Sequence, residues 1–350
     1  MIEEMEWFHY LIEVLAIVLV AVGLSQNLLY FLQLTLAIRA LKPERARIDS
    51  ASLWRRYSAT CPPICILAPA YNEEAGIVES TKALLALQYP RMEVIVINDG
   101  SKDGTLDCLI KAFEMNPSYR IFQEVVPHQP IKGIYRSASY PNLVVVDKHN
   151  GGKADAMNAG INVSRSPLFC AMDSDSIIES DALLRMVQPF VDQPGRTVAV
   201  GGSVRVVNGC SVSSGRVVKI RTPDRLVALF QVLEYMRAFS VARVAWSELK
   251  TLTLISGAFG VFRRDVVVDV GGYSTDTVGE DLDLVLKMHA LLIERKVKYN
   301  IVFLPEPLCW TEVPETLTVL KRQRSRWQRG ALEVFIRHRH MLFNPRYGRI

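Results

Sequence analysis

The chain has 350 residues, of which 49% are hydrophobic and 22% are charged. This length and composition exclude a disordered, collagenous or fibrous protein and predict one large α/β domain, or about two domains, with a sizeable buried core. The net charge of +5 comes from one end, because residues 321–350 hold nine Lys and Arg and one acid, whereas the other 320 residues hold 32 bases and 35 acids. A nucleic acid partner would require a basic face over the fold itself, so we expect no nucleic acid and a lipid bilayer as the partner of the basic segment.

Residues 14–38 form a run of 25 residues without a charge. As a helix the run would be about 37 Å long, enough to cross a hydrocarbon core of about 30 Å. No Lys or Arg precedes it, whereas several basic residues follow it at once: Arg39, Lys42, Arg45 and Arg47. The positive-inside rule therefore predicts a transmembrane helix in residues 1–41 of an inner or plasma membrane protein, with its N-terminus outside and the rest in the cytoplasm. A buried helix of a soluble protein is the alternative.

The polar residues 25–27 lie in the middle of this run and predict further transmembrane helices or subunits as partners. We expect these neighbours to follow residue 350 or to belong to another chain.

After an expected linker over residues 42–63, apolar runs alternate with segments of helical spacing. The apolar runs predict strands over residues 64–68, 93–97, 143–146 and 168–172. The helical spacing predicts helices over residues 75–87, 103–115 and 153–163. Residues 116–141 hold four prolines and look like a long connection with at most one strand. Apolar strands between helices favour an α/β fold with a mostly parallel sheet.

The segment after each of these strands is polar. Carboxylates, glycines and a lysine occur in residues 69–74, 98–104, 147–153 and 173–176. Ligands of parallel sheets bind beyond the carboxyl ends of the strands, so the four segments should share one edge. Turn chemistry explains any one of them, but the four together predict a binding site.

Asp173 and Asp175 alternate at the end of a predicted strand. Two close carboxylates repel unless a cation joins them, and oxygen ligands suit Mg²⁺ or Mn²⁺. The competing interpretation is that these residues cap the following helix. If Asp173 and Asp175 are considered without the other motifs, capping explains them better than a metal site does. Lys153 follows two glycines at a predicted helix start, where it could bring charge to a phosphate. The P-loop and dinucleotide-binding fingerprints are absent from the sequence.

Two later segments could carry chemistry as well. Asp281 precedes an amphipathic segment over residues 282–293 and could be a general base, with helix capping as the alternative. Gln323, Arg326 and Trp327 share one helical face. A guanidinium beside an indole suits a diphosphate with a sugar stacked nearby, and a basic interfacial helix is the competing interpretation.

Two stretches have the spacing of interfacial helices. Residues 226–246 carry apolar side chains, with Arg225, Arg237 and Arg243 expected at the edges of the helix. Residues 331–343 mix apolar residues with Arg and His. Both could lie on a membrane surface, although packing in the core is nearly as good an explanation for the first.

Taken in chain order, these motifs resemble those of the family 2 glycosyltransferases. The motifs are Pro69-Ala70-Tyr71-Asn72-Glu73, Asn98-Asp99-Gly100-Ser101, Gly152-Lys153-Ala154, Asp173-Ser174-Asp175, Ser256-Gly257-Ala258-Phe259, Glu280-Asp281 and Gln323-Arg324-Ser325-Arg326-Trp327. The resemblance covers roughly residues 60–340. It is strongest to the membrane-embedded processive branch, which includes cellulose, chitin, hyaluronan and poly-N-acetylglucosamine synthases. Residues 256–260 look closest to the synthases of N-acetylglucosamine polymers.

The resemblance implies a GT-A nucleotide-diphospho-sugar transferase fold over residues 64–315, a UDP-sugar donor and a divalent cation, Mg²⁺ or Mn²⁺. The donor would be bound by five residues: Tyr71, Glu73, Asp99, Lys153 and Asp173. Asp173 and Asp175 would hold the metal on the diphosphate. Asn98 departs from the family, because many members carry an aspartate there, but Asp99 keeps the second acid.

The resemblance also implies roles for the acceptor side. Asp281 would be the catalytic base. The remaining substrate contacts would come from Ser256, Gly257 and Glu280, and from Gln323, Arg326 and Trp327 in a C-terminal unit over residues 316–350.

The activity implied is inverting, metal-dependent and processive β-transfer of a hexose or N-acetylhexosamine from a UDP-sugar to a growing polysaccharide. Two alternatives remain open. One is transfer of a single sugar to a lipid acceptor, as in the similar ceramide glucosyltransferases. The other is an inactive, nucleotide-binding scaffold subunit of a secretion complex.

Overall fold

The structure, a computed structural model of the chain, describes residues 2–41, 49–213 and 215–347. Residues 42–48 of the expected linker lie outside the described residues. The rest of that stretch contains a helix, α2 (Ser50–Tyr57), whose Leu53 and Tyr57 are buried. Tyr57 Oη donates to Asp192 Oδ1 at 3.1 Å, which ties α2 to the globular body.

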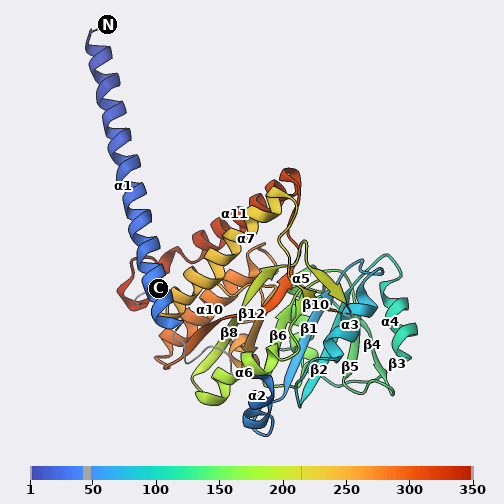
Figure 1. Cartoon of the computed structure of the whole chain (residues 1–350). Helices are drawn as coiled ribbons and strands as arrows, with labels where there is room; N and C mark the ends of the chain where they lie inside the picture. Colours follow the sequence, from blue (N-terminus) through green and yellow to red (C-terminus); the bar gives the residue numbers. More distant parts are fainter. Residues whose placement is uncertain (1, 42–48, 214, 348–350) are drawn as a thin grey trace.

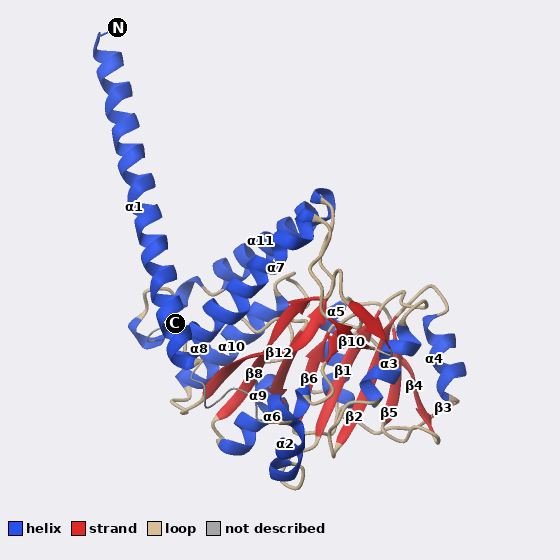
Figure 2. Cartoon of the chain, in the orientation of Figure 1, coloured by secondary structure: helices blue, strands red, loops and turns tan. Residues whose placement is uncertain are grey.

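Ten of the described strands form one sheet, which Figures 1 and 2 show from the same side. Their order across the sheet is β3 (Met115–Pro117), β4 (Ile131–Ser137), β5 (Leu143–Lys148), β2 (Met92–Asp99), β1 (Ile64–Ala70), β6 (Leu168–Met172), β11 (Phe259–Arg263), β8 (Thr197–Val206), β12 (Asn300–Thr311) and β7 (Ile177–Ile178). The central strands β5, β2, β1 and β6 are parallel, with Ile66 beside Val94 on one side and Cys170 on the other.

The sheet is less parallel than the sequence predicted. The pairs of β3 with β4, β4 with β5, β6 with β11, β11 with β8, and β12 with β7 are antiparallel. The stretch 116–141 contributes two strands to the sheet instead of the single one expected. β1 continues through Pro69, although proline has no N–H to donate. β6 pairs with β1 only as far as Leu67, so no hydrogen bond from Pro69 to β6 is required.

Helices lie beside the sheet (Figure 2). They are α3 (Ile77–Leu85), α4 (Thr105–Phe113), α5 (Lys153–Val163), α6 (Ala182–Asp192), α7 (Leu226–Tyr235), the π-helix η2 (Met236–Ala242), α8 (Arg243–Glu248), α9 (Arg264–Asp269), α10 (Glu280–Glu294) and α11 (Leu317–Arg337). The 3₁₀ turns η3 (Arg339–Met341) and η4 (Pro345–Tyr347) follow α11, and a small hairpin of β9 (Ser211–Ser213) and β10 (Arg216–Lys219) precedes α7. The helix predicted over residues 153–163 and the strand predicted over residues 168–172 have the predicted bounds.

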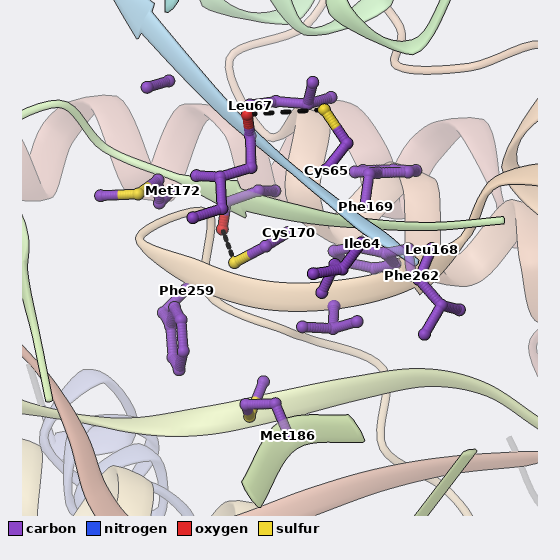
Figure 3. Packing of buried hydrophobic residues seen from close by; sticks show 14 of the residues in the cluster. Ile64, Cys65, Leu67, Leu168, Phe169, Cys170, Met172, Met186, Phe259 and Phe262 are labelled. Carbon is purple, nitrogen blue, oxygen red and sulfur yellow. Dashed lines mark hydrogen bonds between the residues drawn. The ribbon is translucent and has the colours of Figure 1, made fainter. Parts of the chain in front are cut away.

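The core lies around β1, β6 and β11. Figure 3 shows Ile64, Phe169 and Phe262 packed together, and the rings of Phe169 and Phe262 stack with their centroids 5.5 Å apart. β1 and β6 are buried along almost their whole lengths. Because these strands are buried in the core, the positions of the loops that follow them are fixed.

The predicted transmembrane run lies in α1 (Ile2–Ala40). Its segment His9–Ala40 is long and apolar enough to cross a membrane, and most of its large apolar side chains are exposed. Figure 1 shows α1 projecting from the body. Its C-terminal turns pack against η2 and α8, where Gln33 and Ala37 are buried and Arg237 lies 5.0 Å from the Tyr30 ring centroid.

The polar side chains in the middle of α1 find partners in their own helix. Ser25 Oγ donates to the Ala21 carbonyl and Asn27 Nδ2 donates to the Gly23 carbonyl, each at 2.8 Å. Both donors are therefore satisfied within α1, and the further transmembrane helices expected from these residues stay a prediction.

Candidate functional site

The polar segments that follow the four parallel strands lie at one edge of the sheet. Because β1, β2, β5 and β6 run in the same direction, residues 71–74, 100–104, 149–152 and 173–176 leave the sheet on the same side. The first two segments interlock, since the Asn72 N–H donates to Ser101 Oγ at 3.0 Å and Asn72 Oδ1 accepts from the Lys102 N–H at 2.9 Å. Tyr71 beside them is 46% exposed, so its ring is open to a ligand.

Asp99, the expected nucleotide contact, is buried and holds a loop. Its carboxylate accepts hydrogen bonds from Lys148 Nζ at 2.6 Å, Asn150 Nδ2 at 3.1 Å, the Gly151 N–H at 3.0 Å and the Gly152 N–H at 2.7 Å. These bonds fix the loop that leads into α5 and carries Lys153. In this structure Asp99 acts on the site through that loop, and its direct contact with a nucleotide stays a prediction.

Lys148 lies beneath the same loop and is fully buried. Its ammonium contacts Asp99 at 2.6 Å and Asp155 at 2.5 Å. Asp155 also accepts from the Gln129 N–H at 2.9 Å. Lys148 and Asp155 were not predicted as site residues, because a lysine at the end of an apolar strand and an acid in the first turn of a helix are both ordinary at exposed positions.

Residues from four distant segments converge beyond the end of β6. Lys153 Nζ, at the start of α5, forms an ion pair with Asp173 Oδ1 and donates to the Gly257 carbonyl at 3.3 Å. The Gly257 N–H donates to Asp281 Oδ2 at 3.1 Å. A Cβ at Gly257 would lie 3.0 Å from Lys153 Nζ and 3.6 Å from Asp281 Oδ2, so a side chain there would displace the Lys153 ammonium. Ser256, the residue before it, accepts from the Ala258 N–H at 3.4 Å.

Carboxylates crowd the end of β6. Burial raises the pKa of Asp175, and Asp173 raises it further. Burial, followed by Asp175, raises the pKa of Glu73 in the same way. Such a set of oxygens is relieved by a divalent cation, and Mg²⁺ commonly takes one or two carboxylates and fills its other positions with phosphate oxygens and water. Asp173 and Asp175 therefore fit the expected metal pair, although among the described residues no group of three or more His, Cys, Asp or Glu side chains is arranged to hold a metal ion.

The excess of negative charge also raises the pKa values of Lys153 and Glu280. Burial raises the pKa of Glu280, and Asp281 adds to the shift. Burial alone would lower the pKa of Lys153, but Asp173, Glu280 and Asp281 together raise it above its ordinary value. The cluster is thus short of positive charge and suits a ligand that arrives with a cation.

α11 crosses the start of α10 at a contact between two glycines. A Cβ at Gly330 would lie 2.8 Å from Gly279 N, and a Cβ at Gly279 would lie 2.9 Å from the Gly330 carbonyl oxygen. Glu333 Oε2 accepts from Thr277 Oγ1 at 2.9 Å and strengthens the contact. Because Asp281 lies in the first turn of α10 and the Gln-x-x-Arg-Trp segment lies one turn before Gly330, this crossing sets their relative positions.

The guanidinium over the Trp327 ring belongs to Arg324 and not to Arg326. Arg324 Cζ lies 4.4 Å from the ring centroid, and its Nη2 pairs with Glu234 Oε2 of α7 at 2.6 Å. Arg326 and Trp327 are exposed. Gln323 Oε1 is buried and has no hydrogen-bond partner among the described residues. The binding roles expected for Gln323, Arg326 and Trp327 stay predictions.

Arg243 was expected at the edge of an interfacial helix, but the structure leaves the residue only partly exposed and buries the Nη1 atom of its guanidinium. Its Cζ lies 3.8 Å from the Phe239 ring centroid, and its Nη1 is buried without a hydrogen-bond partner among the described residues. Burial lowers the pKa of Arg243 to about 10, against the opposing effects of Asp281 and Tyr235. Only the fold brings Arg243 near Asp281, so no local signal in the sequence could have found it.

The arrangement has the parts for group transfer from an activated phosphate ester. It joins Lys153 and Asp173 through Gly257 to Asp281, a carboxylate that accepts from the Gly257 N–H. A base fixed opposite an anion-binding group can take a proton from an attacking hydroxyl while the leaving group departs on the other side.

Known proteins resemble this chain over most of its length. It is 30% identical over 274 residues to a poly-β-1,6-N-acetyl-D-glucosamine synthase of Staphylococcus epidermidis, and 31% identical over 275 residues to that of Staphylococcus aureus strain COL. Each alignment covers 78% of this chain, and the chain spans 56% of the length of each relative. The resemblance to processive synthases expected from the sequence is thereby confirmed.

Among solved structures, a mannosyltransferase of Pyrobaculum calidifontis in complex with GDP-Man and Mn²⁺ aligns with a TM-score of 0.58 at 20% identity, covering 91% of this chain and 75% of that one. This likeness confirms the GT-A fold. The family model described as Glycosyl transferase family 2 matches residues 65–270, which is more than half of the chain. The chain therefore belongs to glycosyl transferase family 2.

Proposed function

We propose that this chain transfers N-acetylglucosamine, or a similar hexose, from a UDP-sugar to the end of a growing β-linked polysaccharide, with inversion at the anomeric carbon. The observation that carries the proposal is the convergence of Lys153, Asp173, Gly257 and Asp281, which lie far apart in the sequence. The names of the relatives from Staphylococcus support the choice of N-acetylglucosamine.

The donor would lie across the edge formed by β1, β2, β5 and β6. Tyr71, Glu73 and the loop held by Asp99 would contact the nucleoside, and Lys153 would contact the diphosphate. Asp173 and Asp175 would hold Mg²⁺ or Mn²⁺, which neutralises charge on the departing diphosphate when it is bound. Before the donor binds, Lys153 forms an ion pair with Asp173 and neutralises its charge.

The acceptor would lie on the side of Asp281. Asp281 takes the proton of the attacking hydroxyl, the hydroxyl oxygen forms a bond to C1 of the donor sugar, and the bond between C1 and the diphosphate oxygen breaks, so that UDP leaves. The Gly257 and Leu282 N–H groups hold the two oxygens of Asp281, at 3.1 and 2.8 Å. Ser256, Glu280, Gln323, Arg326 and Trp327 would complete the substrate contacts.

We place this reaction at the cytoplasmic face of an inner or plasma membrane. α1 supports a membrane anchor, because its apolar side chains are exposed along a length sufficient to cross a bilayer. The basic residues that follow the apolar run support a cytoplasmic catalytic domain. Exposed Leu226, Phe230 and Leu233 on α7 support contact with lipid or with further transmembrane helices.

The test compares wild type with Asp281→Asn, using the full chain in detergent with UDP-N-acetylglucosamine and Mg²⁺ or Mn²⁺. UDP release and product size are both measured. Asp281→Asn should lower turnover roughly 10²–10⁴-fold, since a general base contributes about this much. Asp107→Asn, an exposed acid in the first turn of α4, is the matched control and should keep wild-type turnover.

Each outcome has a defined meaning. Near-wild-type turnover by Asp281→Asn would remove the base assignment. A product one sugar long on a lipid would replace polysaccharide synthesis with lipid glycosylation. A wild-type chain that neither binds nor hydrolyses any UDP-sugar with either metal would overturn the transferase proposal and favour a scaffold.

A further inference from the structure

The helical segment formed by α7, η2 and α8 places three neighbouring side chains, Tyr235, Phe239 and Arg243, at intervals of four residues. Tyr235 and Phe239 have ring centroids 5.4 Å apart, and the guanidinium carbon of Arg243 lies 3.8 Å from the Phe239 centroid. Phe239 packs in turn against Phe303 of β12, with centroids 6.2 Å apart. The guanidinium therefore lies over an aromatic ring in a cation–π contact.

The described residues leave part of this guanidinium without a hydrogen-bond partner. Among the described residues, none forms a salt bridge with Arg243, and Nη1 is buried without any hydrogen-bond partner. An N–H group of a charged side chain that is buried and unbonded costs free energy, and such groups are rare in folded proteins unless a ligand completes them. The position thus calls for an oxygen atom from outside the chain.

The surroundings restrict what that ligand is. Asp281 opposes the effect of burial on the pKa of Arg243, so the predicted base lies within electrostatic range of the guanidinium. In the proposed function the substrate beside Asp281 is the acceptor, so the acceptor is the substrate that we assign to this guanidinium. The negative charge of Glu280 and Asp281 disfavours a second anion, whereas a neutral hydroxyl oxygen accepts from a guanidinium without that cost.

We propose that Arg243 donates hydrogen bonds to hydroxyl oxygens of the acceptor sugar and presents that sugar to Asp281, with Tyr235 and Phe239 forming the surface on which the guanidinium rests. The inference rests on the proposed function and goes beyond it by naming the residue that receives the acceptor. The π-turn of η2 lies between Tyr235 and Arg243, and π-turns within helices are frequent at functional sites.

The experiment uses the full chain in detergent and compares wild type, Arg243→Met and Arg243→Lys. Arg225→Met is the matched control, because Arg225 is exposed just before α7. Three quantities are measured: UDP affinity by calorimetry, hydrolysis of UDP-N-acetylglucosamine without an acceptor, and the KM for a short N-acetylglucosamine oligomer. The melting temperature of each variant is recorded as well.

Arg243→Met should lower kcat/KM for the oligomer roughly 10- to 100-fold, as expected for the loss of hydrogen bonds from a charged donor. UDP affinity and hydrolysis should stay within about twofold of wild type. The melting temperature should stay unchanged or rise, because the methionine removes a buried unpaired charge. Arg243→Lys should recover part of the acceptor affinity, and Arg225→Met should match wild type.

Other results would overturn the proposal. Loss of UDP affinity with an unchanged oligomer KM would assign Arg243 to the donor diphosphate. A lower melting temperature with equal losses in all assays would give it a purely structural role. An unchanged oligomer KM with unchanged UDP affinity would leave it without a role in binding. Failure of the wild type to bind UDP at all would instead count against the proposed function, so the two failures are distinguishable.

Discussion

Replacement of Lys148 by methionine tests whether the buried charge network supports the donor side of the site. Lys148 is fully buried and contacts Asp99 at 2.6 Å and Asp155 at 2.5 Å. Lys148→Met leaves both buried carboxylates without their cation. Removal of one partner from a buried pair costs about 3–5 kcal/mol, and two carboxylates depend on this lysine, so we expect a loss toward the upper end of that range.

The assay is denaturant unfolding of the full chain in detergent, followed by tryptophan fluorescence, together with UDP binding. Lys132→Met is the matched control, because the Lys132 side chain is 41% exposed and its Nζ makes a long contact with Asp147 Oδ2, at 4.0 Å. We expect it to cost less than about 1 kcal/mol. Lys148→Met combined with Asp155→Asn should recover part of the stability. If Lys148→Met unfolded at the same denaturant concentration as Lys132→Met, the network would not stabilise the loop and our account of Asp99 would be wrong.

Three further predictions follow from the site. Gly330→Ala should separate α11 from α10, because the alanine Cβ would lie 2.8 Å from Gly279 N. Sugar transfer should fall at least tenfold. Gln328→Ala on the same helix is the control and should leave sugar transfer unchanged. Gly257→Ala should lower transfer at least tenfold with little change in melting temperature, since the atom nearest the new Cβ is the mobile end of Lys153 at 3.0 Å. Burial alone would raise the pKa of Asp283, but hydrogen bonds to His338 and Ser274 lower it to about 2. Its stabilising effect, on the order of 2 kcal/mol, is therefore complete above about pH 4 and is lost as the pH falls through 2. Melting temperatures from pH 5 to 2 should fall more steeply for wild type than for Asp283→Asn, and parallel curves would contradict this assignment.

The sequence predicted the parallel centre of the sheet because short apolar runs with glycine and aspartate after them are distinctive. α5 and β6 have the predicted bounds for this reason. The antiparallel strands beyond β6 were not predicted, because β11, β8 and β12 pair with neighbours that are distant in the chain. The strand pair around residues 115–137 was missed because its prolines suggested an irregular connection.

The site was predicted as a set of motifs but not as a set of contacts. Local chemistry marked Asp173, Asp175 and Asp281, since acids at strand ends and helix starts are visible in the sequence. Lys148 and Arg243 looked like residues of exposed positions, and only the fold buries Lys148 and the Nη1 atom of Arg243. The contact of Arg324 with the Trp327 ring was not predicted either, because it accompanies an ion pair with Glu234, which is distant in the sequence.

The two substrates of the proposed reaction depend on different elements. The donor would bind at the ends of the central strands, whereas the proposed acceptor residue Arg243 follows η2 at the start of α8, and the end of α1 packs against both of these elements. A bilayer that is thicker or thinner than the apolar length of α1 changes the tilt of that helix, at a cost of a fraction of a kcal/mol per Å. Lipid acyl-chain length should consequently tune elongation while leaving nucleotide uptake constant, which would make membrane thickness a regulator of the polymer.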